Sequence, residues 1–479
     1  MAVVLTGSDL TPEEVVRVAR EAEPASLDPD ANQRMAATRA VLERSLERSD
    51  EVYGLTTGVG AAKTRKVEPE DAAATARRLV RVHRVAQGGL LTTEMVRAAT
   101  LVMVNGFARG SAGVRPGLAA FLVGALNDGR LPPVRALGSV GQADLAPLAE
   151  LADGLLGDGF ELAPGEGLAL LGSNAFATGA AALGVADAER QLDAVDASAA
   201  LSLEAFGANL GVLQPAVAAA RPYEGLRASL ERLRALLHGS HLEDEGAARN
   251  LQDPLTFRTV AVVHGAARDA LAFARAQLSV ELNGVQTSPM VLPEEDRMIS
   301  APNFEPVALA QAVDFARIAL APALSSASER VVKLLDEPWS GLPRGLVDGA
   351  NDGLSYLGIA VQGIAAEARL LAAPVSFELV STAHAEGIED RMALGHLGAR
   401  RLAEMTALGQ RIAAIELAVA AQAVELRDAG RLGEGTAAIL RIVRGRIPRM
   451  EPGDDAPPDV EPLLEAISSG MLTLGIGHW

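Results

Sequence analysis

The chain has 479 residues, 49% of them hydrophobic and 22% charged, which is usual for a soluble protein with a sizeable core. Its 43 Lys and Arg against 61 Asp and Glu give a formal net charge of −18, which argues against nucleic acid or an anionic membrane as a partner. The chain contains no cysteine, which excludes disulfides, thiolate metal sites and thiol nucleophiles.

The sequence predicts neither a secretory signal peptide nor a membrane span. The N-terminal run Met1-Ala-Val-Val-Leu is too short, and lacks the basic lead, for a secretory signal peptide. No uninterrupted apolar stretch reaches the ~18 residues of a membrane span. We therefore expect a cytoplasmic protein that does not bind a membrane.

Helical periodicity dominates the chain. Apolar residues at helical spacing predict helices over Leu10–Ala22, 70–87, 94–109, Asp187–Leu203, Phe257–Leu282, Val307–Leu335, Gly353–Leu371 and Asp390–Asp428. The last exceeds ~25 residues, a length typical of a bundle or an oligomer core. Its alanine-rich faces favour close helix–helix packing.

Glycine- and proline-rich segments separate these helices, and they predict long functional loops at Tyr53–Gly60, Gly110–Gly117, Arg130–Pro147, Ala163–Gly172, Gln286–Glu305, Ser340–Gly353 and Met450–Pro458. The predicted class is all-α. We expect an N-terminal loop-and-helix domain over residues 1–190, a central bundle of long helices over 191–430, and a C-terminal linker with short helices over 431–479.

The first candidate site is the loop Glu51-Val-Tyr-Gly-Leu-Thr-Thr-Gly-Val-Gly60. Three glycines in seven residues allow a loop to close over a ligand. A phenol such as that of Tyr53 acts as a general base when nearby cations lower its pKa. On this loop alone, a glycine-rich turn with a packing tyrosine is the favoured interpretation.

Three further stretches accompany this loop, and they read Gly138-Ser-Val-Gly-Gln-Ala-Asp-Leu-Ala-Pro-Leu-Ala149, Gln252-Asp-Pro-Leu-Thr-Phe-Arg258, and Glu281-Leu-Asn-Gly-Val-Gln-Thr-Ser-Pro289 followed by Pro302-Asn-Phe-Glu-Pro306. In this order and spacing the stretches resemble the aromatic amino acid ammonia-lyase family, which comprises histidine, phenylalanine and tyrosine ammonia-lyases and related aminomutases. The resemblance covers about residues 3–430, and so many ordered matches are specific.

The resemblance implies an ammonia-lyase-like (fumarase/aspartase-like) fold. It further implies a homotetramer in which loops from neighbouring subunits complete each active site. The family's electrophile is a methylidene-imidazolone formed from an internal Ala-Ser-Gly. This group captures the substrate, so that ammonia leaves while a tyrosine removes a β-proton.

This sequence departs from the family at the electrophile. Where the family has Ala-Ser-Gly-Asp, the chain has Gln142-Ala143-Asp144, one residue shorter. It offers no serine to dehydrate and no glycine to cyclise, and Ser139 belongs to the preceding motif. We therefore expect no methylidene-imidazolone and no other cofactor. Other electrophile-side changes are Gly172 for an asparagine (unless Asn174 reaches across), Leu255 for a tyrosine, Gly358 for a glutamine, and the shortened Asn303-Phe-Glu-Pro306.

The substrate side matches the family better. The resemblance assigns Tyr53 as the base, His83 to recognition of the substrate side chain and Arg258 to the substrate carboxylate, a task suited to a bidentate donor. It places Glu389 near the substrate amine. The remaining positions assigned to substrate contact are Asn303, Phe304, Gly60 and Leu255.

Each assignment has a plainer alternative. His83 could be a packed core histidine, Arg258 an interface salt bridge, and Glu389 with Asp390 an acidic pair at a helix N-terminus. His238 and His241 stand near three acidic residues, but no further anchored ligand accompanies them, and we expect no metal.

Three functions remain open. The first is an enzyme without the electrophile that performs elimination, isomerisation, conjugate addition or cyclisation on an amino-acid-derived carboxylate, free or tethered to a carrier protein. Here Tyr53 moves the proton, with His83 or Glu389 assisting. The second is a catalytically inactive homologue that serves as a binding or scaffold subunit. The third is an ordinary ammonia-lyase whose electrophile forms from other residues.

Overall fold

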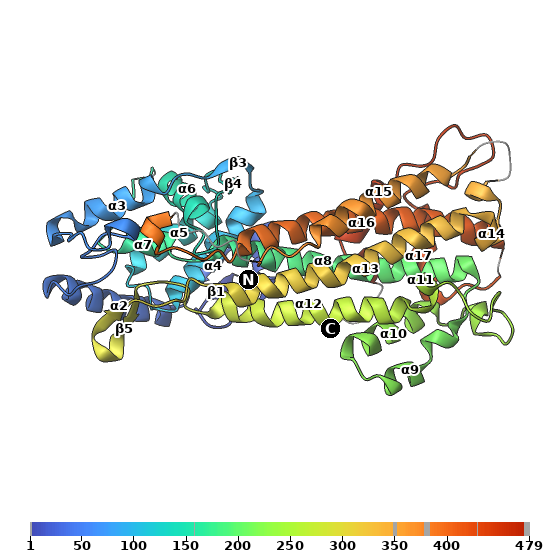
Figure 1. Ribbon diagram of the computed structural model, residues 1–479, viewed down its shortest axis with the longest axis horizontal. Helices are drawn as coiled ribbons and strands as arrows, with labels where there is room; N and C mark the ends of the chain where they lie inside the picture. Colours follow the sequence, from blue (N-terminus) through green and yellow to red (C-terminus); the bar gives the residue numbers. More distant parts are fainter. Residues whose placement is uncertain (1, 158, 348–351, 378–383, 429, 474–479) are drawn as a thin grey trace. The chain divides into compact units, whose positions relative to one another are not determined.

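The structure, a computed structural model, describes residues 2–157, 159–347, 352–377, 384–428 and 430–473 (Figure 1). Helices make up most of it, which confirms the predicted all-α class. The strands of the described residues form three two-stranded pairs, which are β1 (Val3–Leu5) with β2 (Ala25–Leu27), β3 (Gln87–Leu90) with β4 (Arg135–Leu137), and β5 (Met290–Leu292) with β6 (Arg297–Ile299). The first pair is parallel and the others are antiparallel.

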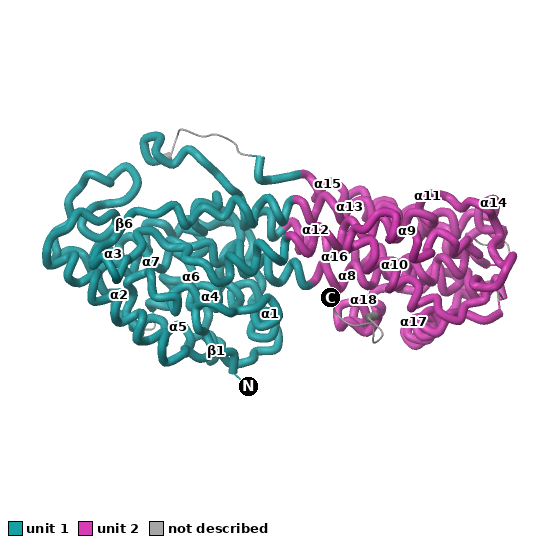
Figure 2. Tube along the Cα trace, turned by 90° about the horizontal axis from the view of Figure 1, so that it is seen from below, with its two compact units in different colours: residues 1–186, 274–314, 374–400 teal, residues 187–273, 315–373, 401–479 magenta. Residues whose placement is uncertain are grey.

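The chain divides into two compact units, coloured separately in Figure 2. Unit 1 comprises residues 1–186, 274–314 and 374–400, and unit 2 comprises 187–273, 315–373 and 401–479. Four long helices contribute residues to both units, namely α8 (Ala175–Phe206), α12 (Val260–Asn283), α13 (Val307–Leu335) and α16 (Gly395–Arg427). The division predicted at residues 190 and 430 stays a prediction.

The shorter helices of unit 1 are α1 (Pro12–Arg20), α2 (Pro29–Glu47), α3 (Ala72–Val82), α4 (Thr93–Ala108), α5 (Pro116–Asn127), α6 (Leu145–Leu156) and α7 (Glu166–Leu171). Their ends follow from local chemistry. The Thr11 hydroxyl accepts the N–H of Glu14 while the Glu14 carboxylate accepts the N–H of Thr11, a capping box that starts α1. Helix α4 is buried along nearly all of its length and packs against α1 and α5.

Unit 2 contains the shorter helices α9 (Pro215–Ala220), α10 (Glu224–Leu237), α11 (Leu255–Arg258), α14 (Glu337–Ser340), α15 (Ser355–Leu371), α17 (Glu434–Arg444) and α18 (Pro462–Ser468). Buried charges join its long helices. The fully buried Glu416 carboxylate accepts two hydrogen bonds from Arg330, at 2.5 and 3.0 Å, and one from the Ser198 hydroxyl at 2.6 Å. This network links α8, α13 and α16 through their unit 2 residues.

The helix bounds differ from the predictions in two informative places. Helix α8 begins at Ala175, well before the predicted Asp187, because residues 175–185 are buried on all sides of the helix and therefore show no amphipathic period. Helix α16 begins at Gly395 and not at Asp390. The preceding residue, Leu394, has a positive φ of 53°, which breaks the helix there.

Three helical stretches, residues 166–206, 307–335 and 395–427, are long and apolar enough to cross a membrane by length and composition alone. Their apolar windows are 94%, 56% and 78% buried within the protein. Helix packing therefore accounts for much of this apolar surface.

Candidate active site

The Tyr53 loop closes on itself in unit 1. The Tyr53 phenol oxygen accepts a hydrogen bond of 2.8 Å from the backbone N–H of Gly60. The half-buried ring lines a narrow cavity of about 10 Å³, whose wall also includes Leu168 and Thr287. Burial raises the pKa of the Tyr53 phenol; the Gly60 hydrogen bond opposes this and the charge of Glu389 adds to it. The causes of this shift among the described residues include no nearby cation, and the assignment of Tyr53 as the base stays a prediction.

Glu389 lies beside the same loop. A Cβ atom placed on Gly60 would lie 3.8 Å from Glu389 Oε1 and 3.4 Å from the Ala385 methyl. Because α16 begins only at Gly395, Glu389 is not in the first turn of that helix. The structure thus brings Tyr53, Gly60 and Glu389 together.

The segment that replaces the family's Ala-Ser-Gly is ordered by its own contacts. Ala143 is buried and has a positive φ of 60°. The Gln142 Nε2 donates to Glu305 Oε2 at 2.8 Å. The fully buried Asp144 accepts from the Ser139 hydroxyl at 2.7 Å and from the Ala177 N–H at 2.8 Å. Burial raises the pKa of the Asp144 carboxyl to about 6.

The side chain of Asn174 reaches toward this segment, which is the possibility that the sequence analysis left open for this residue. Its Nδ2 donates to the Phe304 carbonyl at 2.6 Å, and the Ala143 N–H donates to the same carbonyl at 3.4 Å. Phe304 therefore lies next to the segment. Asn303, its neighbour, directs its Nδ2 at the sulfur of Met290, 3.5 Å away.

His83 caps the C-terminal end of α3 in unit 1. Its Nδ1 lies 2.9 Å from the Leu79 carbonyl, and the residue is half-buried. No contact in the described residues joins His83 to Tyr53 or Glu389, so its assignment to substrate recognition stays a prediction.

Arg258 and Leu255 belong to unit 2, on the short helix α11. The Arg258 Nη1 donates to Gln252 Oε1 at 3.3 Å, and its Nε has no hydrogen-bond partner among the described residues. Leu255 is 61% exposed. The preceding Asp253 accepts from the Asn209 N–H at 2.7 Å, which fixes the turn that presents α11.

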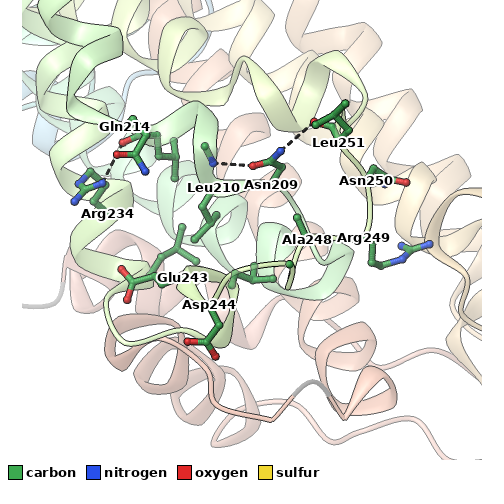
Figure 3. Close-up of a pocket in the computed structure, with 15 residues that line it drawn as sticks. Asn209, Leu210, Gln214, Arg234, Glu243, Asp244, Ala248, Arg249, Asn250 and Leu251 are labelled. Carbon is green, nitrogen blue, oxygen red and sulfur yellow. Dashed lines mark hydrogen bonds between the residues drawn. The ribbon is translucent and has the colours of Figure 1, made fainter.

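A cavity of about 630 Å³ adjoins this turn in unit 2 (Figure 3). Asn209 and Leu251 line it, and the Asn209 side chain donates to the Leu251 carbonyl at 3.0 Å. Its charged lining residues include Arg249, which donates to the Phe206 and Trp339 carbonyls, and Glu243 and Asp244. The lining thus mixes both signs of charge.

The sequence is similar to those of a known protein family. The model of the aromatic amino acid lyase family matches residues 10–161 and 158–445. A histidine ammonia-lyase of Symbiobacterium thermophilum is 33% identical, over 99% of this chain and 98% of the relative, and one of Alkaliphilus metalliredigens is 31% identical, over 94% and 93%. The chain belongs to the aromatic amino acid lyase family.

Solved structures of this family share the fold. The ergothioneine degrading enzyme ergothionase of Treponema denticola, in complex with desmethyl-ergothioneine sulfonic acid, superposes with a TM-score of 0.91 at 27% identity, over 99% of this chain and 100% of that one. The tyrosine aminomutase of Streptomyces globisporus gives 0.90 at 28% identity, over 99% and 98%. The predicted ammonia-lyase fold is confirmed.

The residues present do not fit the methylidene-imidazolone of this lyase family. Its formation consumes a serine and a glycine, whereas residues 140–172 contain no serine or threonine. The Ser139 hydroxyl is bonded to Asp144, and the Gln142 amide to Glu305. Sequence reasoning missed Glu305 as a site residue; the one available signal was the Glu-Pro pair that ends the shortened Asn303-Phe-Glu-Pro306 stretch.

No group of three or more His, Cys, Asp or Glu residues that could hold a metal ion occurs within the residues that the structure describes. His241, one of the two histidines considered for a metal, has its Nδ1 3.2 Å from the Arg431 carbonyl. The expectation of no metal stays a prediction.

Proposed function

We propose that this chain is a lyase of the family that works without the methylidene-imidazolone and eliminates an amine from an amino-acid-derived carboxylate, with Tyr53 as the base. One observation carries the proposal. The base loop with Tyr53, Gly60 and Glu389 is assembled, while Gln142 and Ala143 occupy the place where the family forms its electrophile.

The missing electrophile restricts the substrate. A free amino group is a poor leaving group, and the β-proton next to it is not acidic. A protonated primary amine can lose its N–H proton to a base and then leaves poorly, whereas a fully alkylated nitrogen has no N–H to lose, keeps its positive charge and leaves as a neutral amine without covalent activation. One structural neighbour is an ergothioneine degrading enzyme, and ergothioneine is a betaine, an amino acid derivative with a fully methylated nitrogen. We therefore place betaines first among the substrates of this chain.

The elimination balances without a cofactor. The Tyr53 phenolate takes the β-proton, the electrons of that C–H bond form the new double bond, and the C–N electrons leave with the amine. Because burial raises the pKa of Tyr53, its phenolate is scarce at neutral pH but strongly basic when it forms. The family resemblance assigns the substrate carboxylate to Arg258, whose planar guanidinium can bind it in bidentate fashion. His83 assists in side-chain recognition and Glu389 at the nitrogen.

The assembly and setting belong to the same proposal. We infer a cytoplasmic homotetramer, whose neighbouring subunits complete each active site, with no nucleic acid or membrane partner. The net charge of −18 supports the last point.

The test compares the turnover of N,N,N-trimethylhistidine with that of histidine. The reaction is monitored by the absorbance of the unsaturated acid and by the release of trimethylamine. The wild type should convert the betaine, and Tyr53→Phe should lower turnover by ~100-fold or more. Tyr223→Phe, which removes the hydroxyl of an exposed tyrosine of unit 2, is the matched control and should change nothing. Near-normal turnover by Tyr53→Phe would rule out the role of Tyr53 as the base.

A catalytically inactive subunit is the second candidate, favoured by the accumulated changes at Gly172, Leu255 and Gly358. It predicts co-purification with an active homologue and no turnover by the isolated protein. A homo-oligomer that converts a betaine alone would rule it out.

A further inference from the structure

Four buried oxygen atoms of unit 1 have no hydrogen-bond partner among the described residues, and they are Ser173 Oγ, Asn174 Oδ1, Thr287 Oγ1 and Glu305 Oε1. An unsatisfied buried polar atom costs free energy, so such atoms call for an explanation. Two of the four, the Asn174 amide oxygen and the Glu305 carboxylate oxygen, are acceptors only. The other two are hydroxyls, which can donate or accept, so the acceptor-only pair of Asn174 and Glu305 is the part of the group suited to a positively charged ligand.

Hydrogen bonds place Ser173, Asn174 and Glu305 beside the segment 142–144. The Ser173 carbonyl accepts the Asp144 N–H at 2.8 Å. The Asn174 N–H donates to Gln286 Oε1 at 3.1 Å. Thr287, the residue after Gln286, lines the same narrow cavity as the Tyr53 side chain.

Glu305 is held so that only one of its oxygens is engaged. Its Oε2 accepts from Gln142 Nε2 at 2.8 Å and lies 3.5 Å from Arg391 Nη1. The Glu305 side chain is 18% exposed, and that of Arg391 is 49% exposed. The Gln142 amide therefore orients the carboxylate and leaves Oε1 for another group.

The segment 389–394 connects this carboxylate to the base loop. Glu389 lies beside Gly60, Arg391 pairs with Glu305, and the Leu394 N–H donates to the Val140 carbonyl at 3.1 Å. All these residues belong to unit 1. Glu305 and Tyr53 thus flank one short stretch of chain.

We propose that Glu305, oriented by Gln142 and assisted by Asn174, forms a binding subsite for the cationic nitrogen of the substrate, at the place where the family carries its electrophile. The inference rests on the proposed function, since it names how a betaine would be recognised. A fully alkylated nitrogen has no N–H, so charge and not a hydrogen bond provides its attraction, and partial burial strengthens that attraction.

This subsite acts on affinity and not on the rate of bond breaking. The positive charge disappears as the amine leaves, so Glu305 stabilises the bound substrate more than the transition state. Loss of its charge should raise KM and leave kcat unchanged or slightly higher. If the role of Glu305 were merely structural, its substitution would lower the stability of the protein without raising KM at an unchanged kcat.

The test uses two ligands that differ only at the nitrogen, N,N,N-trimethylhistidine and imidazolepropionate, titrated calorimetrically into the full-length protein. Glu305→Gln should weaken binding of the betaine by ~10-fold or more, because it removes a contact to a charged group, and should change that of imidazolepropionate by less than about twofold. Glu294→Gln, an exposed carboxylate of the same unit, is the control and should change neither. Equal weakening of both ligands by Glu305→Gln would overturn the subsite.

Arg391→Gln gives an independent test of opposite sign, which does not depend on folding of the Glu305 variant. Removing the cation that competes for Glu305 should tighten binding of the betaine by about threefold or more, with imidazolepropionate unchanged or weaker. Unchanged or weaker betaine binding in Arg391→Gln would contradict the inference.

The outcomes separate the subsite from the reaction. Discrimination between the ligands that depends on Glu305, with no turnover of the betaine, supports the subsite and contradicts the proposed elimination. Turnover of the betaine, with an affinity for it that is unchanged in Glu305→Gln, supports the elimination and contradicts the subsite. If the wild type binds neither ligand, both proposals are wrong.

Discussion

The phenol oxygen of Tyr53 accepts a hydrogen bond of 2.8 Å from the backbone N–H of Gly60, so that the loop between them is closed by the side chain assigned as the base. The position of the phenol therefore depends on the backbone conformation of Gly60, whose φ is +56°. Any substitution that changes this backbone should move the base.

Gly60→Ala should lower kcat/KM by ~10-fold or more through misplacement of Tyr53. A side chain at positive φ costs ~1–2 kcal/mol, and the new Cβ would lie 3.4 Å from the Ala385 methyl. Gly129→Ala is the matched control, because Gly129 has a φ of +68° and a Cβ atom added there would meet nothing within 4 Å. Both variants should lose similar stability in urea, but only Gly60→Ala should lose activity. Equal activities would show that the loop geometry is not needed.

The pH profile of betaine turnover should rise on the alkaline side. Burial raises the pKa of Tyr53 above its ordinary value of about 10, and the phenolate is the active form. The logarithm of kcat/KM should therefore increase with pH at least to pH ~10, and the residual activity of Tyr53→Phe should lack that rise. A plateau that begins below pH ~8 would mean that a cation of the assembled protein lowers this pKa, or that another group is the base.

Asp144 should make the free energy of unfolding fall as pH rises, which is opposite to the effect of a carboxylate in an ion pair. Its pKa is about 6 in the folded protein against 3.8 unfolded, so the folded state binds the proton more tightly. The resulting stabilisation is complete below the unfolded pKa and is lost as pH rises through 6. Relative to the wild type, Asp144→Asn should gain about 2 kcal/mol in free energy of unfolding between pH 4 and pH 8. Denaturant titrations at both pH values measure this.

Asp455→Asn, a change at an exposed carboxylate of the C-terminal segment, is the control for that experiment and should leave the pH dependence of stability as it is in the wild type. A pH dependence of Asp144→Asn that equals that of the wild type would contradict the burial-driven shift.

The buried Arg330–Glu416 pair should be required for stability of unit 2. Glu416→Gln leaves the Arg330 charge buried without its counter-ion, which costs ~3–5 kcal/mol. Glu329→Gln breaks a partly exposed pair with Lys333 on the same helix and should cost less than ~1 kcal/mol. Urea unfolding of the two variants compares them directly, and equal losses would refute the role of burial.

Sequence reasoning reached the fold where helices are amphipathic and end at clear signals. Helix α13 runs over Val307–Leu335, as predicted. It missed the first turns of α8, which are buried on all sides and therefore show no amphipathic period. It also failed to predict α6 and α7 as helices, because glycines and prolines in Arg130–Pro147 and Ala163–Gly172 suggested loops.

The candidate site also has a part that the sequence predicts and a part that only the structure reveals. The Tyr53–Gly60 loop is local, and its glycines and tyrosine are visible in sequence. The contact between Gln142 and Glu305 joins positions 163 residues apart, and no periodicity or spacing reports such a pair. The raised pKa of Tyr53 also required the structure, because it follows from burial.

Catalysis without an internally formed electrophile is tested most directly by the intact mass of a preparation that converts the betaine. The proposed mechanism predicts the mass of the unmodified 479-residue chain. A mass lower by two waters would show that a cyclised and dehydrated group has formed and would contradict that mechanism.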